Sequence, residues 1–139
     1  MDEDAKSVLI RHQRHVTRQR IGVLGLLMEQ KRAFTLKQIA DVLLEASIDR
    51  ITVYRALKSF LTDGIIGKAI NSKGTACFFF LDHLKENRLT QVYLECTECE
   101  QLYGLPELPQ EYLNTLNKYK TTLMPILLEG LCQKNGCKN

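Results

Sequence analysis

The sequence predicts an α+β protein: an N-terminal winged helix-turn-helix domain followed by a small α/β domain. Three observations predict this fold class. A basic amphipathic helix over 49–64 begins only two residues after another helix, 36–46, which is the helix-turn-helix pattern. Two strand-like runs, 65–70 and 75–81, follow directly and are typical of the hairpin that forms a wing. Two cysteine pairs then mark a second domain of strands and helix.

Composition limits the class of protein. The 139 residues suffice for one ordinary domain or two small ones, and 45% hydrophobic with 25% charged residues is normal for a folded protein. There is no apolar run of about 18 residues, so we expect no membrane span. The first residues are acidic, unlike a secretory signal, and we expect a cytoplasmic protein. Thiols stay reduced in that compartment, which favours metal ligands or free thiols over disulfides.

Charge is divided unevenly along the chain. Residues 1–81 carry 13 Lys and Arg against 8 Asp and Glu, whereas residues 82–139 carry 6 against 8. A basic first half suits a polyanion and indicates a nucleic-acid-binding domain, followed by a domain with another role. We expect the DNA-binding domain at 1–82, a polar linker at 83–90 and the α/β domain at 91–139.

Four helices are expected in the first domain. The first spans 5–15, and Thr17 caps the second, at 18–31. Thr35 and Gln38 fit a capping box that begins the helix over 36–46. Basic side chains at the end of the first helix suit its dipole, but four arginines in ten residues are denser than capping requires. Such density also indicates phosphate contacts.

The fourth helix, 49–64, has two chemically different faces. Asp49 is expected to cap its start, and Gly64 to end it. Its apolar residues, among them Val53, Leu57 and Phe60, fall within an arc of about 140°. The opposite face is basic and carries hydroxyl groups. Most such faces are simply solvated, but the helix-turn-helix setting of this one favours a DNA-reading role.

Ten residues are therefore expected to contact DNA. Those expected in or beside the major groove are Tyr54, Arg55, Lys58, Ser59 and Thr52. Those expected at phosphates are Arg14, Arg18, Arg20, Lys37 and, at the tip of the wing, Lys73. Phosphate contacts would position the protein, whereas groove contacts would read sequence.

Strands and one helix are expected in the second domain. Strand-like runs occupy 91–95, 102–105 and 124–128, and a helix beginning with Pro109 spans 109–119. No internal repeat or low-complexity segment interrupts them.

The four cysteines of this domain form two pairs, Cys96-x-x-Cys99 and Cys132-x4-Cys137. A two-residue spacer lets both thiolates bind one tetrahedral ion, and four thiolates complete a closed structural zinc site. We therefore expect one structural Zn²⁺ per chain, although the second spacer is longer than usual.

The alternative is a thioredoxin-like dithiol formed by the first pair of cysteines. That motif needs a helix N-terminus to stabilise its thiolate, whereas strand-like sequence follows here. Three nearby glutamates, Glu95, Glu98 and Glu100, are also expected to raise the pKa of these thiols. The sequence thus favours zinc over redox chemistry.

Together these segments resemble the ferric uptake regulator family over nearly the whole chain. The likeness lies in Thr17-x-x-Arg20, in Ile51-Thr52-Val53-Tyr54-Arg55-Ala56-Leu57, in Gly64-Ile65-Ile66 and in the two cysteine pairs. It implies a bacterial transcription regulator that responds to a metal or peroxide and dimerises through its α/β domain. It also implies that Tyr54 and Arg55 meet DNA and that Arg20 assists.

The chain departs from the family at the positions that usually bind the sensed metal. A family His-x-His ahead of the first cysteine pair is replaced by Gln91 and Tyr93, and a family glutamate by Gly104. A histidine common near the start of the third helix falls at Ala33 or Phe34. These residues are poor ligands for iron, manganese or zinc. The departure predicts a degenerate regulatory site.

The leading hypothesis is a homodimeric DNA-binding regulator, a repressor, that reads a palindrome with half-sites about one helical turn apart. His83 and Glu86, near the linker, are the remaining candidates for a regulatory site, although such residues are more often solvated surface. Two alternatives stay open: a thiol-based redox sensor, and a zinc-stapled protein-interaction module without DNA binding. None of the three is an enzyme.

Overall fold

The computed structural model describes residues 2–29, 32–81, 92–106, 108–119, 126–133 and 137, and the chain divides into two compact units, Met1–Leu81 and Asp82–Asn139. The expected linker at 83–90, with His83 and Glu86, lies outside the described residues. Among the described helices, none has the length and apolarity needed to span a bilayer.

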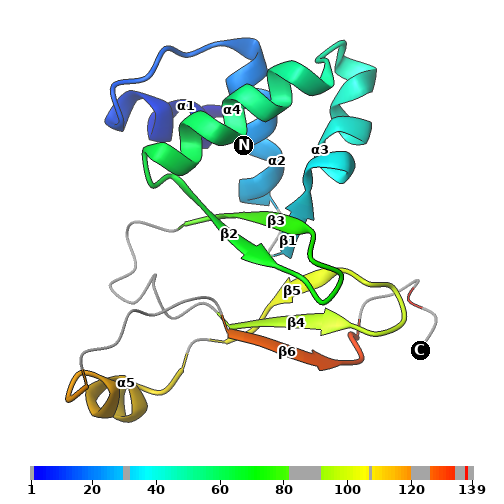
Figure 1. Cartoon of the computed structure of the whole chain (residues 1–139). Coiled ribbons are helices and arrows are strands. Elements are labelled where there is room, and N and C mark those ends of the chain that lie inside the picture. The colour runs from blue at the N-terminus through cyan, green and yellow to red at the C-terminus, as the bar shows by residue number, and fades with distance from the viewer. Residues whose placement is uncertain are drawn as a thin grey trace. The chain divides into compact units, whose positions relative to one another are not determined.

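The first unit packs four helices on a three-stranded sheet (Figure 1). Its helices are α1 (Asp2–Arg11), α2 (Arg18–Glu29), α3 (Leu36–Leu43, continued by a 3-10 turn at Leu44–Ala46) and α4 (Arg50–Thr62). Its strands are β1 (Arg32–Thr35), β2 (Ile66–Ile70) and β3 (Ala76–Phe80). Strand β3 pairs antiparallel with both β1 and β2. The expected winged helix-turn-helix is therefore present, with β2 and β3 as its wing.

Apolar side chains from all four helices and the sheet form one core in this unit. Almost no surface of the largest of them remains exposed: Leu9, Leu24, Leu27, Phe34, Ile39, Leu57, Phe60, Ile65 and Ile66. Because α4 supplies two of these side chains and β2 another, the reading helix and the wing share a single packed interior.

Two features of the first unit differ from the sequence prediction. Helix α1 was expected at 5–15 but ends at Arg11, because Gln13 adopts a left-handed φ of 57° and the chain turns there. Strand β1 was not expected. It forms because Phe34 and Thr35 pair with Phe78 and Cys77 of β3. The sequence around residues 32–35 does not predict this long-range pairing.

The second unit is a smaller sheet with one helix. Strand β4 (Val92–Cys96) lies between β5 (Leu102–Gly104), which is antiparallel to it, and β6 (Ile126–Gly130), which is parallel. Helix α5 spans Gln110–Leu116. The last strand was expected at 124–128; residues 124 and 125 lie outside the described residues, and β6 continues two residues further than expected.

The wing contains a glycine without room for a side chain. Gly67 of β2 faces Phe79 of β3, and a Cβ added to Gly67 would lie 2.5 Å from two atoms of the Phe79 ring. By contrast, a Cβ added to Gly25 in α2 would meet no atom within 4 Å. The same substitution should therefore have opposite effects at these two positions.

We predict that Gly67→Ala destabilises the protein by about 1–3 kcal/mol, because the buried Phe79 ring must move. Gly25→Ala should stabilise it by about 0.5–1 kcal/mol, since alanine loses less entropy in a helix interior. Denaturant unfolding of the two variants and the parent measures both effects. Equal shifts of the two variants in the same direction would contradict the packing described for the wing.

Candidate functional site

Helix α4 is fixed at both ends by the capping residues that the sequence predicts. At its start, the Asp49 carboxylate accepts a hydrogen bond from the Thr52 N–H at 2.7 Å, and bonding from Thr52 lowers the pKa of Asp49. At its end, Gly64 has a φ of 73°, and the N–H groups of Gly64 and Ile65 donate back to carbonyls of the last turn. This paired bonding is a Schellman motif. Both ends of the helix are thus set by local chemistry.

The two faces of α4 separate as expected. Val53, Ala56, Leu57 and Phe60 are buried in the core. Tyr54, Arg55 and Lys58 are exposed on the opposite side, while Thr52 and Ser59 are half-buried. Because the buried face is fixed in the core, the helix can offer only this outer, basic face to a partner.

Arg14 makes an ion pair within the protein. Its Nε donates to the Asp63 carboxylate at 2.6 Å, and its Nη2 donates to the other carboxylate oxygen. Asp63 is the C-cap residue of α4, 49 positions away in the sequence. The pair therefore ties the turn after α1 to the end of the reading helix. Asp63 was not among the residues singled out from the sequence, and only this long-range contact identifies it.

Two other arginines expected at phosphates also bind carbonyl groups of the protein. Arg18 Nη1 donates to the Ala46 carbonyl at 2.5 Å, at the end of the 3-10 turn after α3. Arg20 Nη1 donates to the His15 carbonyl at 3.0 Å. Each guanidinium carries five N–H donors, so these bonds leave donors for a further ligand. The arginines thus order the basic segment between α1 and α2.

The remaining expected phosphate contacts are exposed lysines. Lys37 lies in the first turn of α3, and its Nζ is 3.9 Å from Asp41. Lys73 lies in the exposed turn between β2 and β3, where the Asn71 side chain accepts hydrogen bonds from the N–H groups of Lys73 and Thr75. The turn is therefore held in shape, with Lys73 at its surface. All ten residues expected at DNA belong to the first unit.

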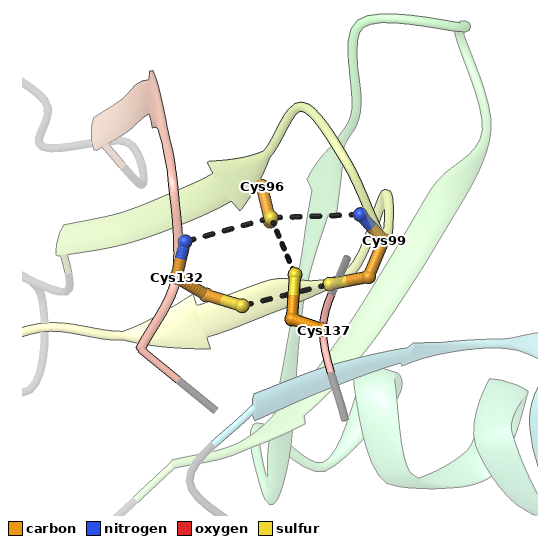
Figure 2. A group of neighbouring side chains, drawn as sticks. All are labelled: Cys96, Cys99, Cys132 and Cys137. Atoms are coloured by element: carbon orange, nitrogen blue, oxygen red, sulfur yellow. Dashed lines mark hydrogen bonds between the residues drawn. The ribbon is translucent and has the colours of Figure 1, made fainter. Parts of the chain in front are cut away.

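The four cysteines of the second unit come together, as the sequence predicts (Figure 2). Their Sγ atoms all lie within 4.8 Å of one another; Cys96 and Cys137 are 3.5 Å apart, and Cys99 and Cys132 are 3.7 Å apart. None of the four is in a disulfide. Among the described residues, this is the one group of three or more potential ligand side chains placed to hold a metal ion.

The sulfur geometry fits a tetrahedral ion. Zinc–thiolate bonds of about 2.3 Å place the sulfurs of a tetrahedral site about 3.8 Å apart, close to the two measured separations. The longer Cys132-x4-Cys137 spacer does not keep Cys137 from the group. Four thiol donors suit a closed site for a soft or borderline ion.

Hydrogen bonds favour the thiolate form of Cys96. The backbone N–H groups of Cys99 and Cys132 each donate to its Sγ at 3.5 Å, and these bonds lower the pKa of Cys96 to about 6. The sequence-based expectation that neighbouring glutamates raise this pKa is therefore wrong. Of the three glutamates, Glu98 and Glu100 are exposed, so water screens their charges. Glu95 is buried but directly precedes Cys96 in β4, so the two side chains lie on opposite faces of the strand, whereas the amide donors contact the sulfur directly.

Tyr103 is a member of this site that the sequence did not indicate. Its hydroxyl is 3.4 Å from the Sγ of Cys99, and hydrogen bonding from Tyr103 lowers the pKa of Cys99. Burial raises the pKa of Tyr103 itself, so the phenol keeps its proton and can donate it to the sulfur. Tyr103 lies near Cys99 because β5, which contains Tyr103, pairs antiparallel with β4 just before the first cysteine pair.

The described residues at the positions that the resemblance matches to sensory metal ligands are a tyrosine, a glycine, an alanine and a phenylalanine. Tyr93 of β4 and Gly104 of β5 are direct partners across the sheet, and Tyr93 is only 3% exposed. Burial raises the pKa of Tyr93, which keeps it a neutral phenol at physiological pH. Ala33 and Phe34 lie in the core of the first unit. Gln91 lies outside the described residues.

No protein-family model and no curated protein matches the sequence. Solved structures do match it. The ferric uptake regulator of Vibrio cholerae is 21% identical, with a TM-score of 0.67 over 91% of this chain and 98% of that chain. A zinc uptake regulator complexed with zinc and DNA is 24% identical, with a TM-score of 0.65 over 95% and 90% of the two chains.

The Pseudomonas aeruginosa ferric uptake regulator with manganese is 19% identical, with a TM-score of 0.67 over 94% of this chain and 98% of that chain. These likenesses show that the chain has the ferric uptake regulator fold. The α+β fold class predicted from the sequence is confirmed.

We predict that Tyr103→Phe weakens metal binding at the four cysteines by about tenfold, the lower end of the usual effect of residues that orient metal ligands. The variant loses the hydroxyl beside Cys99 but keeps the ring. Competition between the protein and a chromogenic chelator, with Co²⁺ as a visible thiolate-bound probe, measures the affinity. Tyr112→Phe, at an exposed tyrosine of α5, is the matched control and should bind as tightly as the parent. If both variants bind metal as tightly as the parent, Tyr103 does not contribute to metal binding.

Proposed function

We propose that this protein is a sequence-specific DNA-binding transcription regulator of the ferric uptake regulator type, and a repressor, rather than an enzyme. The observation that carries the proposal is the exposed basic face of α4 in a winged helix-turn-helix. The likeness in fold to a zinc uptake regulator complexed with DNA supports the same conclusion. Net positive charge in the first 81 residues adds attraction for a polyanion.

In this proposal Tyr54, Arg55 and Lys58 enter the major groove, flanked by the half-buried Thr52 and Ser59. Exposed arginine and lysine side chains are the usual readers of guanine there. The outward position of all three follows from the burial of the opposite face of α4.

Phosphate contacts come from Lys37, Lys73, Arg18 and Arg20. Hydrogen bonds of the last three hold the backbone around them in place. Arg14 uses the N–H of Nε and one N–H of Nη2 on Asp63, so its two Nη1 N–H groups and the second N–H of Nη2 are left for a phosphate. We propose that its charge is largely balanced by Asp63 and that it contributes less than the other four.

The second unit, in this proposal, joins two copies of the chain. A two-fold dimer places two α4 helices on a palindromic operator with half-sites about one helical turn apart. The protein would act in the cytoplasm, the compartment that holds the DNA of a bacterium. The residue boundaries proposed are 1–82 for DNA binding, 83–90 for the linker and 91–139 for dimerisation and metal binding.

We propose that the four cysteines hold one structural Zn²⁺ per chain. Four thiolates leave no open position for substrate or water, which is the arrangement of structural rather than catalytic zinc. The ion would join β4 to the segment after β6 and so hold the end of the chain. Residues Tyr93 and Gly104 support the further proposal that the usual sensory metal site is degenerate.

Arg55 tests the reading role of α4. Arg55→Ala should weaken binding to the preferred operator by about 1–3 kcal/mol and relax sequence preference at one base pair. Lys37→Ala is the matched control, because loss of a phosphate contact should weaken all sequences equally and reduce the salt slope by about one. Fluorescence anisotropy across operator variants and salt concentrations measures both. Unchanged binding by Arg55→Ala would exclude α4 from the DNA interface.

Metal content tests the proposed zinc site and the degenerate sensor. Protein purified without chelator should contain one zinc per chain by mass spectrometry, and Cys137→Ser should lose it. Adding Fe²⁺, Mn²⁺ or Zn²⁺ should give no second ion per chain. Uptake of a second ion would contradict the degenerate site.

The lowered pKa of Cys96 is the one observation favouring a thiol-based sensor instead. Metal-free protein with reactive Cys96 and Cys99 as isolated would establish that alternative. A zinc-containing protein that fails to bind any DNA at low salt would point to the protein-interaction module.

A further inference from the structure

Ile51 is an apolar residue on the otherwise polar outer face of α4. It lies in the first turn of the helix, and 63% of its surface is exposed. The same helix buries Val53, Leu57 and Phe60 almost completely, so α4 has room in the core for apolar side chains but does not place Ile51 there. This orientation follows from the buried face, because Ile51 precedes the buried Val53 by two residues and so lies about 160° away from it around the helix.

Ile51 shares one stripe of the helix with the proposed reading residues. Positions 51, 55 and 58 are separated by four and three residues, so their side chains lie above one another on one face. Arg55 and Lys58 on this stripe are exposed as well. Recognition helices direct their N-terminal residues to the base edges. Ile51 therefore occupies the end of the stripe that would reach deepest into the groove.

The chemistry of an isoleucine side chain restricts what it can read. It has no donor or acceptor, and the apolar group that base pairs present in the major groove is the C5-methyl of thymine. Burying that methyl against Ile51 would remove apolar surface of both partners from water. A hydrogen-bonding edge facing Ile51 would instead lose its water without gaining a partner.

We propose that Ile51 is a specificity-determining residue that reads a thymine in each half-site through its C5-methyl group. The inference rests on the proposed function, because it needs α4 in the major groove. It adds a named base and a named contact to the polar reading by Tyr54, Arg55 and Lys58. It also assigns a role to a side chain that lies mostly outside the core.

The experiment couples one protein side chain to one methyl group. Sites are first selected from a random duplex pool by the full-length, metal-containing protein. Each thymine of the selected site is then replaced in turn by deoxyuridine, which removes only the C5-methyl. For the parent, one replacement per half-site should weaken binding about fourfold, since a buried methyl group contributes about 0.8 kcal/mol. For Ile51→Ala the same replacement should have an effect below twofold.

Ile10→Ala is the matched control. Ile10 is an isoleucine of similar exposure, 58%, on α1 of the same unit, and its variant should keep the parent's fourfold response. Alanine suits both exposed helix positions, so circular dichroism should show parent-like folding for both variants.

The possible failures are distinguishable. A deoxyuridine response that is the same in the parent and Ile51→Ala would overturn the Ile51 assignment while leaving the proposed function intact. A parent protein that enriches no sequence from the pool would overturn the proposed function and this inference together.

Discussion

The two-faced geometry of α4 is the constraint on which the proposed function depends. Its apolar face is fixed in the core by Val53, Leu57 and Phe60, and its ends are fixed by Asp49 and Gly64. Each residue of a helix is rotated by about 100° from the next, so burial of these three side chains sets the direction of every other side chain on α4. The core residues therefore decide which side chains reach a partner, and the capping residues set where the helix begins and ends.

Contacts made by arginine side chains also fix the basic segment between α1 and α2. Arg14 binds Asp63 at the end of α4, and Arg20 binds the His15 carbonyl. An exposed ion pair contributes little to stability by itself, but the two-point geometry of guanidinium on carboxylate fixes direction. The same arginines that look like a phosphate-binding cluster in the sequence therefore also shape the segment that carries them. A basic cluster can serve both purposes because guanidinium has more donors than one partner uses.

Several features that depend on residues close together in the sequence were predicted correctly. The Thr35–Gln38 capping box is present, with both reciprocal hydrogen bonds, because all its groups lie within four residues. The four cysteines were also predictable, since metal ligation imposes their type. Strand β1, the Asp63 partner of Arg14 and the Tyr103 contact to Cys99 were not, because each depends on segments brought together by folding. The prediction for the pKa of Cys96 was wrong for a related reason. A sequence shows which residues are charged, but it does not show which backbone N–H groups will donate to the sulfur.

In the second unit, the strands at the proposed sensory positions pair regularly, although the residues there are not the usual metal ligands. The register that makes Tyr93 and Gly104 direct partners is a property of the β4–β5 ladder. A buried phenol packs well in that position, but it holds its proton and offers no charge to a cation. In the proposed degenerate site, these residues keep the strand pairing but are not the usual ligands. The cysteine group differs, because it keeps four thiol ligands, which come from segments up to 41 residues apart. The proposed structural ion and the proposed loss of a sensory ion therefore concern different residues, and both lie outside the unit that contains α4.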